Sequence, residues 1–241
     1  MNVLAILIAL FVGGFLIWWL IIETEGVYLG RRAVIALYDL YAARYDRIKQ
    51  FDETADQALI ARPLMERIQP LADPLILDVA TGTGRLPLLM ARNGGFDGHV
   101  IGLDASRRML NVAGRKVAAE VFAGYITLMR HDAGELPFAD NSFDVVTCLE
   151  ALEFLPGPRA ALQEMIRVLR PGGLLLTSIR IDSPWMPNRA WSEARMRAVL
   201  EALDMRDIRI EIWQEDYSQV WAWKAGESEP IGAGRLAQVL R

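Results

Sequence analysis

Two aspartates of this sequence end short apolar runs, and the first of them leads into a turn rich in glycine. Asp78 lies in "LILDV", which is followed by "ATGTG" with Gly82 and Gly84. Asp104 ends "HVIGLD", 20 residues after Gly84. Glycines let the backbone turn tightly and approach a ligand closely, and a carboxylate at this spacing accepts the hydroxyl groups of a ribose. These residues predict a site for a nucleoside-like ligand.

A glycine turn with a distant aspartate also serves plain chain reversal, so further stretches are needed to support the prediction. Asp132 follows the third apolar run in "HDAGELPFADNSFD", and acids follow the fourth run in "DVVTCLEALEFL". The sequence "VLRPGGLLLTS" places a Pro-Gly-Gly turn before the fifth run. A nicotinamide dinucleotide would require a third glycine three residues after Gly84, and that position holds Pro87. The missing glycine counts against a dinucleotide.

The elements that must position these residues alternate between strand and helix from residue 74 onward. Helical stretches such as "SRRMLNVAGRKVAAEV" and "PRAALQEMIRVLR" separate five short apolar strands. This alternation is typical of βαβ units with a parallel sheet covered on both faces. The last two runs, "MRDIRIEIWQED" and "SQVWAWKA", lack a helix between them and predict an antiparallel pair at the sheet edge. The expected fold is α/β, a Rossmann-like doubly wound sheet of seven strands, mostly parallel with an antiparallel edge strand.

Composition narrows the classes of partner. The net charge is -4, and acids and bases are interspersed without a basic block, so nucleic acid is not an expected partner. The single cysteine, Cys148, excludes an internal disulfide, and its position in an apolar strand indicates a small buried hydrophobe. With only His99 and His131 available, no metal site is expected.

The first residues predict a membrane anchor. Residues 3–22 form an uncharged stretch of 20 residues, which is long enough to cross a bilayer as a helix. A cleaved signal peptide would have a basic start and a shorter apolar region, so we expect a retained anchor. Trp18 and Trp19 lie near its end, and the basic residues that follow predict a single-pass protein with a cytoplasmic domain: Arg31, Arg32, Arg44, Arg47 and Lys49.

The chain is thus expected to divide into four parts. Residues 1–24 form the N-terminal transmembrane anchor, and residues 25–70 a helical lead-in with a break or bend near Pro63. Residues 71–226 form the ligand-binding α/β domain, and residues 227–241 a loose C-terminal tail.

The ordered set of motifs in residues 36–180 resembles the class I S-adenosylmethionine-dependent methyltransferases. It looks most like the methyltransferase type 11 branch, which contains the quinone-biosynthesis enzymes. The resemblance implies that S-adenosylmethionine is the cofactor and that residues 71–226 are its binding domain. It also implies a set of cofactor-binding residues: Asp78, Ala80, Gly82, Gly84, Asp104, Ala105, Asp132, Ala133 and Leu149.

Within that set, the resemblance implies distinct roles. "DVATGTG" would be the cofactor loop, Asp104 would hold the ribose hydroxyls, and Asp132 with Ala133 would meet adenine. Leu149 would line the cofactor. The family often has glycine where this chain has Ala80, and the extra methyl group would narrow the approach to the cofactor.

Methyl transfer from a sulfonium is an in-line displacement, so alignment matters more than a nucleophilic side chain. A nearby base, or ionisation of the acceptor in the pocket, would complete the reaction. Glu150, Glu153 and His131 are the candidate catalytic bases, although solvated or structural roles fit all three as well. "IDSPWMPNRAWSE" lies where the family places a lid, and its residues Trp185, Met186 and Trp191 could line an apolar acceptor pocket or be structural.

The sequence therefore favours a membrane-anchored methyltransferase that acts on a small, apolar or membrane-derived acceptor, such as a quinone-like ring or lipid, at oxygen or carbon. "CLEAL" replaces the Asn/Asp-Pro-Pro-Tyr motif of enzymes that methylate base or glutamine amines, which argues against those acceptors. The alternative is a noncatalytic, membrane-tethered binding or assembly module that keeps the fold. Asp78 and Asp104 disfavour this alternative, because a degenerate site would be free to lose them.

Overall fold

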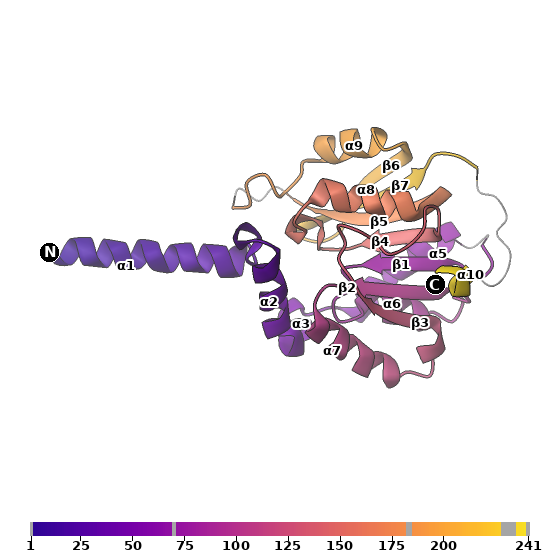
Figure 1. Ribbon diagram of the computed structural model, residues 1–241, viewed down its shortest axis with the longest axis horizontal. Coiled ribbons are helices and arrows are strands. Elements are labelled where there is room, and N and C mark those ends of the chain that lie inside the picture. The colour runs from indigo at the N-terminus through magenta and orange to yellow at the C-terminus, as the bar shows by residue number, and fades with distance from the viewer. Residues whose placement is uncertain (1, 69–70, 182–184, 228–234, 240–241) are drawn as a thin grey trace.

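The computed structural model describes residues 2–68, 71–181, 185–227 and 235–239. Its centre is a seven-stranded sheet in the order β3-β2-β1-β4-β5-β7-β6 (Figure 1). The strands are β1 (Leu75–Val79), β2 (His99–Asp104), β3 (Ile126–Arg130), β4 (Phe143–Cys148), β5 (Leu169–Arg180), β6 (Met205–Ile212) and β7 (Tyr217–Lys224). The first five strands are parallel, so their carboxyl ends meet at one edge of the sheet.

The predicted antiparallel pair at the sheet edge is confirmed. β7 runs antiparallel to both β5 and β6, and it lies between them, so the outermost strand is β6. Pairing jumps from Phe143 with Leu169 to Val145 with Leu174, and this irregularity absorbs the Pro-Gly-Gly turn into β5. Gly172 at that point has a φ of 70°, in the left-handed region that glycine tolerates best.

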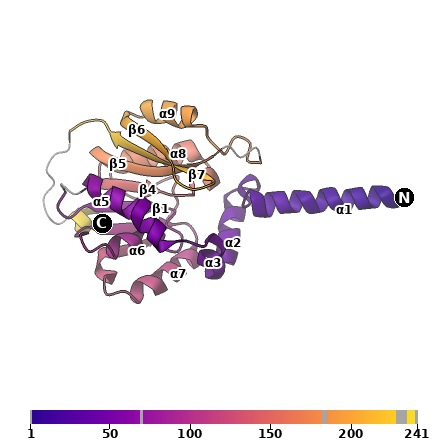
Figure 2. The ribbon, with the colours of Figure 1, turned by 180° about the vertical axis from the view of Figure 1, so that it is seen from behind.

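Helices cover both faces of the sheet, as the βαβ pattern predicts. α8 (Pro158–Val168) and α9 (Glu193–Glu201) cover the face seen in Figure 1, whereas α5 (Arg62–Ile68) and α6 (Arg85–Ala91) cover the face seen in Figure 2. Alternate residues of β1 supply the two cores, with Leu77 in one and Ile76 in the other. α7 (Arg107–Ala118) packs beside β3.

The lead-in is helical and crosses the carboxyl edge of the sheet. It comprises α2 (Arg31–Tyr41), η3 (Ala42–Arg44), α3 (Tyr45–Lys49), α4 (Glu53–Asp56) and η4 (Gln57–Ala61). η4 is a π-helical turn that ends directly before Arg62 and Pro63, where the sequence predicts a break or bend. α2 lies at the end of the domain from which the N-terminal helix projects (Figures 1 and 2).

The N-terminal helix stands away from the domain. α1 (Val3–Trp18) has no buried residue and continues into the π-helical turn η1 (Trp19–Glu23). Among the described residues, Val3–Glu23 is the one helix whose length and composition would allow it to cross a membrane. η2 (Val27–Leu29) then links this rod to α2.

The tail was expected to be loose, but part of it is helical. α10 (Arg235–Val239) places Leu236 and Val239 against the core on the α8 face of the sheet. Residues 228–234 and 240–241 of the predicted tail lie outside the described residues. Two apolar side chains at helical spacing explain the docking of α10.

Candidate functional site

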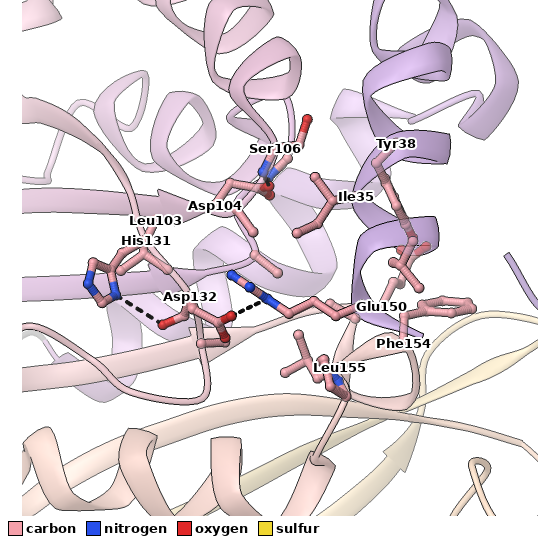
Figure 3. A pocket seen from close by; sticks show the side chains of 18 of the residues that line it. Ile35, Tyr38, Leu103, Asp104, Ser106, His131, Asp132, Glu150, Phe154 and Leu155 are labelled. Carbon is pink, nitrogen blue, oxygen red and sulfur yellow. Dashed lines mark hydrogen bonds and ion pairs between the residues drawn. The ribbon is translucent and has the colours of Figure 1, made fainter. Parts of the chain in front are cut away.

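A pocket opens at the carboxyl edge of the sheet, beneath α2 (Figure 3). It encloses roughly 750 Å³ of space, part of which is open to solvent. The pocket brings together nine residues singled out from the sequence: Ala80, Gly82, Asp104, Ala105, His131, Asp132, Ala133, Leu149 and Glu150.

The glycine turn between β1 and α6 is built from left-handed backbone. Ala80, Gly82 and Gly84 have φ values of 57°, 56° and 80°. Gly84 precedes α6, and a Cβ at this position would lie 3.2 Å from the Cβ of Ala113, so the glycine also permits close packing against α7. Gly84 lines neither this pocket nor its neighbour. Its position therefore supports the shape of the loop more than direct contact with a ligand.

Asp104 holds the glycine turn against β2. Its carboxylate accepts hydrogen bonds from the Gly82 amide at 2.8 Å and the Ser106 amide at 2.7 Å. Desolvation in the protein raises the pKa of Asp104 to about 6, although these backbone amides oppose the rise. Each carboxylate oxygen can accept a second hydrogen bond. The side chain can thus receive both hydroxyls of a ribose while it keeps the turn in place.

Asp78 lies deeper than the sequence analysis implies. Its carboxylate accepts a hydrogen bond from the Thr147 hydroxyl at 2.6 Å, and burial raises its pKa to about 6. It lines a smaller neighbouring pocket together with Ala80, Gly82 and Glu150, and it does not line the larger one. Asp78 therefore supports the floor of the site from the side of β4.

The adenine end of the predicted site contains an ion pair that the sequence analysis missed. Arg31, the first residue of α2, pairs through Nε with Asp132, whose other oxygen accepts a hydrogen bond from the Gly134 amide at 2.7 Å. His131 Nδ1 lies 3.2 Å from the carbonyl oxygen of Asp132 (Figure 3). No sequence spacing connects Arg31 with Asp132, because only the fold brings α2 to the end of β3.

Glu150 is tied into a buried network. Its backbone is left-handed, with a φ of 51°, and its carboxylate contacts Arg85 at 2.6 Å and Lys49 at 3.5 Å. Gln214 donates a further hydrogen bond at 3.1 Å. Arg85 also binds Asp56 through two bonds, at 2.5 and 2.7 Å. Its carboxylate oxygens are therefore engaged by Arg85, Lys49 and Gln214.

Glu153 points away from both pockets. It is 3% exposed, and one carboxylate oxygen accepts a hydrogen bond from the Tyr217 hydroxyl at 2.5 Å. The other oxygen has no hydrogen-bond partner within the described part of the chain. Burial raises the pKa of Glu153. Its surroundings are those of a core residue rather than of a group in contact with a substrate.

The side of the pocket opposite Asp104 is apolar. α2 contributes Val34, Ile35 and Tyr38, which face Phe154 and Leu155 from the segment after β4. Figure 3 shows Tyr38 and Phe154 across the pocket from Asp132. Because one end carries carboxylates and the other aliphatic and aromatic groups, the cavity suits a polar ligand beside an apolar one.

The residues of the predicted lid differ in how far they are exposed to solvent. Met186 and Trp191 are 1% and 5% exposed, whereas Trp185 is 50% exposed, and none of the three lines either pocket at the strand ends. Residues 182–184 of the segment lie outside the described residues. Trp191 packs in the main core, and Met186 packs against Val27 and Phe154.

These features define a class of protein. A doubly wound sheet with a glycine turn after β1 and an acid at the end of β2 is a nucleoside-cofactor domain. Known structures agree with this fold. The chain is similar to a SAM dependent methyltransferase from Aquifex aeolicus, with 23% identity over 72% of this chain and 94% of that one and a TM-score of 0.58. It is also similar to a putative s-adenosyl-l-methionine-dependent methyltransferase from Methanococcus maripaludis, with 18% identity, 79% and 94% coverage and a TM-score of 0.64.

Sequence comparisons narrow the class to a family. The family described as "Methyltransferase domain" matches residues 77–177. A demethylmenaquinone methyltransferase of Clavibacter sepedonicus is 32% identical over 70% of this chain and 67% of its own. A demethylmenaquinone methyltransferase of Porphyromonas gingivalis is 34% identical over 63% of each chain, so the chain spans less than two thirds of that relative. The chain belongs to the class I S-adenosylmethionine-dependent methyltransferases, and S-adenosylmethionine is its cofactor.

Proposed function

We propose that this protein transfers a methyl group from S-adenosylmethionine to a carbon of a small, quinone-like ring that is dissolved in a membrane. The proposal rests on the pocket, in which the carboxylates expected to bind the cofactor lie opposite an apolar wall made by α2 and the segment after β4. The names of the relatives support the acceptor, because they include demethylmenaquinone methyltransferases and a ubiquinone/menaquinone biosynthesis C-methyltransferase of Roseobacter denitrificans, 36% identical over 70% of this chain and 66% of its own.

The cofactor would lie across the carboxyl ends of β1, β2 and β4. Asp104 would accept the ribose hydroxyls, Asp132 the exocyclic amino group of adenine, and the loop from Ala80 to Gly84 would pass the methionine portion. The space around Asp104 fits this assignment, since its backbone partners leave oxygen lone pairs that face the pocket. Arg31 would have to leave Asp132 or share it when adenine binds.

The bound cofactor supplies a methyl group that is already activated for displacement. The chain's own residues then hold the acceptor in line and exclude water, and Val34, Phe154 and Leu155 provide an apolar surface for a ring. The cofactor would supply the methyl group, and the acceptor would release one proton to solvent as its ring carbon gains that methyl group. Glu150 is engaged by cations and Glu153 lines neither pocket, which leaves His131 in the pocket, or ionisation of the acceptor's own hydroxyl, to generate the nucleophile.

The N-terminal helix would anchor the protein, with the domain in the cytoplasm. A removable signal sequence would pass the same test of length and composition. Retention is supported by the junction that follows the helix, because Thr24 and Val27 are 0% and 3% exposed in contact with the domain. Cleavage near the end of α1 would strip these residues of their support. The basic residues after Ile22 favour the cytoplasmic side.

The test uses the purified full chain in lipid vesicles. Calorimetry should show binding of S-adenosylmethionine and of its demethylated product, and a labelled methyl group should appear in a demethylated quinone supplied in the vesicles. Asp104→Asn should weaken cofactor binding while the protein stays folded. Label that appears only in water-soluble products would contradict the acceptor, and cofactor binding without turnover would favour a noncatalytic module.

A further inference from the structure

The loop that begins at Trp185 lies beside the end of the N-terminal helix. The indole Nε1 of Trp19 donates a hydrogen bond to the carbonyl oxygen of Trp185 at 2.8 Å, and the rings of Phe15 and Trp185 are 6.2 Å apart. The hydroxyl of Tyr28 donates to the carbonyl oxygen of Pro187 at 2.7 Å. Both ribbon views show the segment before α9 close to the base of α1 (Figures 1 and 2).

The position of these contacts along the helix indicates the depth at which Trp185 would lie in a membrane. The apolar helix runs from Val3 to Glu23, and Phe15 and Trp19 both precede its end. At about 1.5 Å per residue, they lie on the order of 6 to 12 Å before Glu23 along the axis. Trp185 is therefore level with the last apolar turns of the helix, not with the polar residues that follow.

Trp185 is also unusually exposed for its size. Half of its surface, 50%, is accessible, although its neighbour Met186 is only 1% exposed. Its ring lies 6.2 Å from that of Phe15, which is 40% exposed, and the Phe15 ring lies 5.7 Å from that of Trp18, which is 43% exposed. Together these three rings form a continuous apolar surface around the end of α1.

We infer that Trp185 forms a second membrane contact, inserted in the interfacial zone of the same bilayer that α1 crosses. This inference rests on the proposed anchoring by α1. The partner is lipid because the surface continues that of α1, which has no buried residue. Tryptophan is enriched at this depth, and the carbonyl of Trp185, which would be costly to leave unpaired there, is satisfied by Trp19.

The surrounding charges agree with such a position. Arg31 and Arg32 begin α2 just after the junction; Arg32 is exposed, and Arg31 is held by Asp132 at the pocket. An exposed arginine near the surface of a bilayer is attracted to anionic headgroups. Along the chain, the apolar rings come first and these cations follow. A bilayer has the same order in depth, with the apolar core first and the charged headgroups outside it.

The contact would also connect the bilayer with the pocket. Met186 packs in a small cluster with Val27, Val34 and Phe154, and the last two line the apolar side of the pocket. Insertion of Trp185 therefore fixes the apolar wall of the pocket next to the lipid surface. An acceptor dissolved in the membrane would then reach the site without crossing water.

The experiment uses the full chain in vesicles of phosphatidylcholine and phosphatidylglycerol. Trp185→Cys is labelled with a thiol-reactive fluorophore, and the native chain measures background, since Cys148 is buried. Phe11→Cys, in the middle of α1, is the membrane reference. Val121→Cys is the aqueous reference, because this apolar residue is 89% exposed and follows α7. Quenchers are iodide in water and lipids with a nitroxide close to the headgroup.

Labels at positions 185 and 11 should be quenched several-fold more by the nitroxide lipids than the label at 121, and iodide should give the reverse order for 185 and 121. If the label at 11 responds to lipid but the label at 185 behaves like 121, the second contact is overturned and the anchor stands. If the label at 11 does not respond to lipid, the anchor fails, and this inference fails with it.

A second measurement keeps the indole itself in place. Quenching of the native tryptophan fluorescence by the nitroxide lipids should decrease in Trp185→Phe. Trp191→Phe is the matched control, because Trp191 belongs to the same segment but is 5% exposed and packs in the core. Equal quenching of Trp185→Phe and the native chain would contradict the contact. Binding of S-adenosylmethionine to each variant verifies that the domain has folded.

Discussion

Asp104 has two tasks that depend on the same carboxylate. It holds the glycine turn through the Gly82 amide, and under our proposal it receives the ribose hydroxyls. Its raised pKa means that protonation competes with the second task near pH 6. The carboxylate of Asp78, on the neighbouring strand, titrates in the same range and repels it.

The first prediction concerns pH. Ionised Asp104 accepts two hydroxyls, so cofactor affinity should be constant above about pH 7 and fall by up to about tenfold for each pH unit below 6. Calorimetry between about pH 5 and about pH 8 would measure this dependence. Asp104→Asn should bind weakly but flatten the profile. An unchanged affinity at about pH 5 would contradict the assignment.

The empty protein should respond to pH in the opposite direction. Because the folded-state pKa of Asp104 and of Asp78 is raised to about 6 from the usual 3.8, the folded state binds protons more readily than the unfolded state between these values. The free energy of unfolding should therefore rise as the pH falls from about 6 toward 4. Thermal unfolding without cofactor checks this sign, and a decrease over that window would refute it.

Ala80 gives a prediction about backbone strain. Its φ of 57° is left-handed, which costs a residue with a Cβ about 1 kcal/mol or more. Ala80→Gly should raise the free energy of unfolding by about 0.5 to 1 kcal/mol. Ala105→Gly is the control, since Ala105 lines the same pocket without a positive φ, and it should be neutral or destabilising. Chemical denaturation in detergent would measure both.

Some of these residues could be located from the sequence, whereas others could not. Asp78, Gly82 and Asp104 could be located because local strand and turn patterns mark them. Arg31 and Lys49 could not, because their contacts with Asp132 and Glu150 join segments about 100 residues apart that only the packed lead-in brings together. Charge alone could not tell that Glu150 is paired and that Glu153 is remote from the pocket.

Among the elements, α6 carries two arginines with different surroundings. Arg85 at its start lies between Asp56 and Glu150, with side chains 7% to 15% exposed. Arg92, just after its end, pairs with Glu53 and Glu120 at the surface and is 37% exposed. The same helix therefore offers a buried and an exposed ion-pair network for comparison.

Arg85→Met should destabilise the protein by about 3 kcal/mol or more, because it leaves buried carboxylates without their main partner. Arg92→Met should cost less than about 1 kcal/mol, since exposed pairs are screened by water. Chemical denaturation of both variants gives the comparison. Equal losses would show that burial does not set the strength of these pairs.

The order of the elements was more predictable than their partners. All seven strands could be located from apolar runs and their boundaries, since each run ends at a turn or a charged residue. The insertion of β7 between β5 and β6 was not predicted, although charged residues recur along β6, which is mostly exposed, whereas β7 is mostly buried. The docking of α10 was also missed, since five residues carry little helical pattern of their own.

For the molecule as a whole, the position of the N-terminal helix determines which side of the domain would face a membrane. α1 projects from the end of the domain where the pocket opens and α2 begins (Figure 2). If α1 crosses a bilayer, the carboxyl edge of the sheet faces that bilayer. The far end of the domain, which includes Val121, then faces the aqueous compartment that holds the domain.

Orientation can be predicted from the basic residues. A membrane-impermeant thiol reagent should label Val121→Cys in inside-out vesicles and leave it unlabelled in right-side-out vesicles, because Lys and Arg after the span favour a cytoplasmic domain. The native chain is the control, since its one cysteine is buried. Labelling of right-side-out vesicles alone would reverse the proposed orientation.

The short link between α1 and α2, which covers the pocket, limits where the chain can bend. Gly26 and Gly30, with φ values of 74° and 90°, flank η2, and both Trp19 before η2 and Tyr28 within it donate hydrogen bonds to the loop that begins at Trp185. Gly30 is therefore the glycine between this tethered segment and α2, where the backbone can turn most freely. Under the proposed anchoring, any movement of α2 during product release would take place next to a segment held at the lipid surface. The rate of product release should then depend on the stiffness of the surrounding lipids.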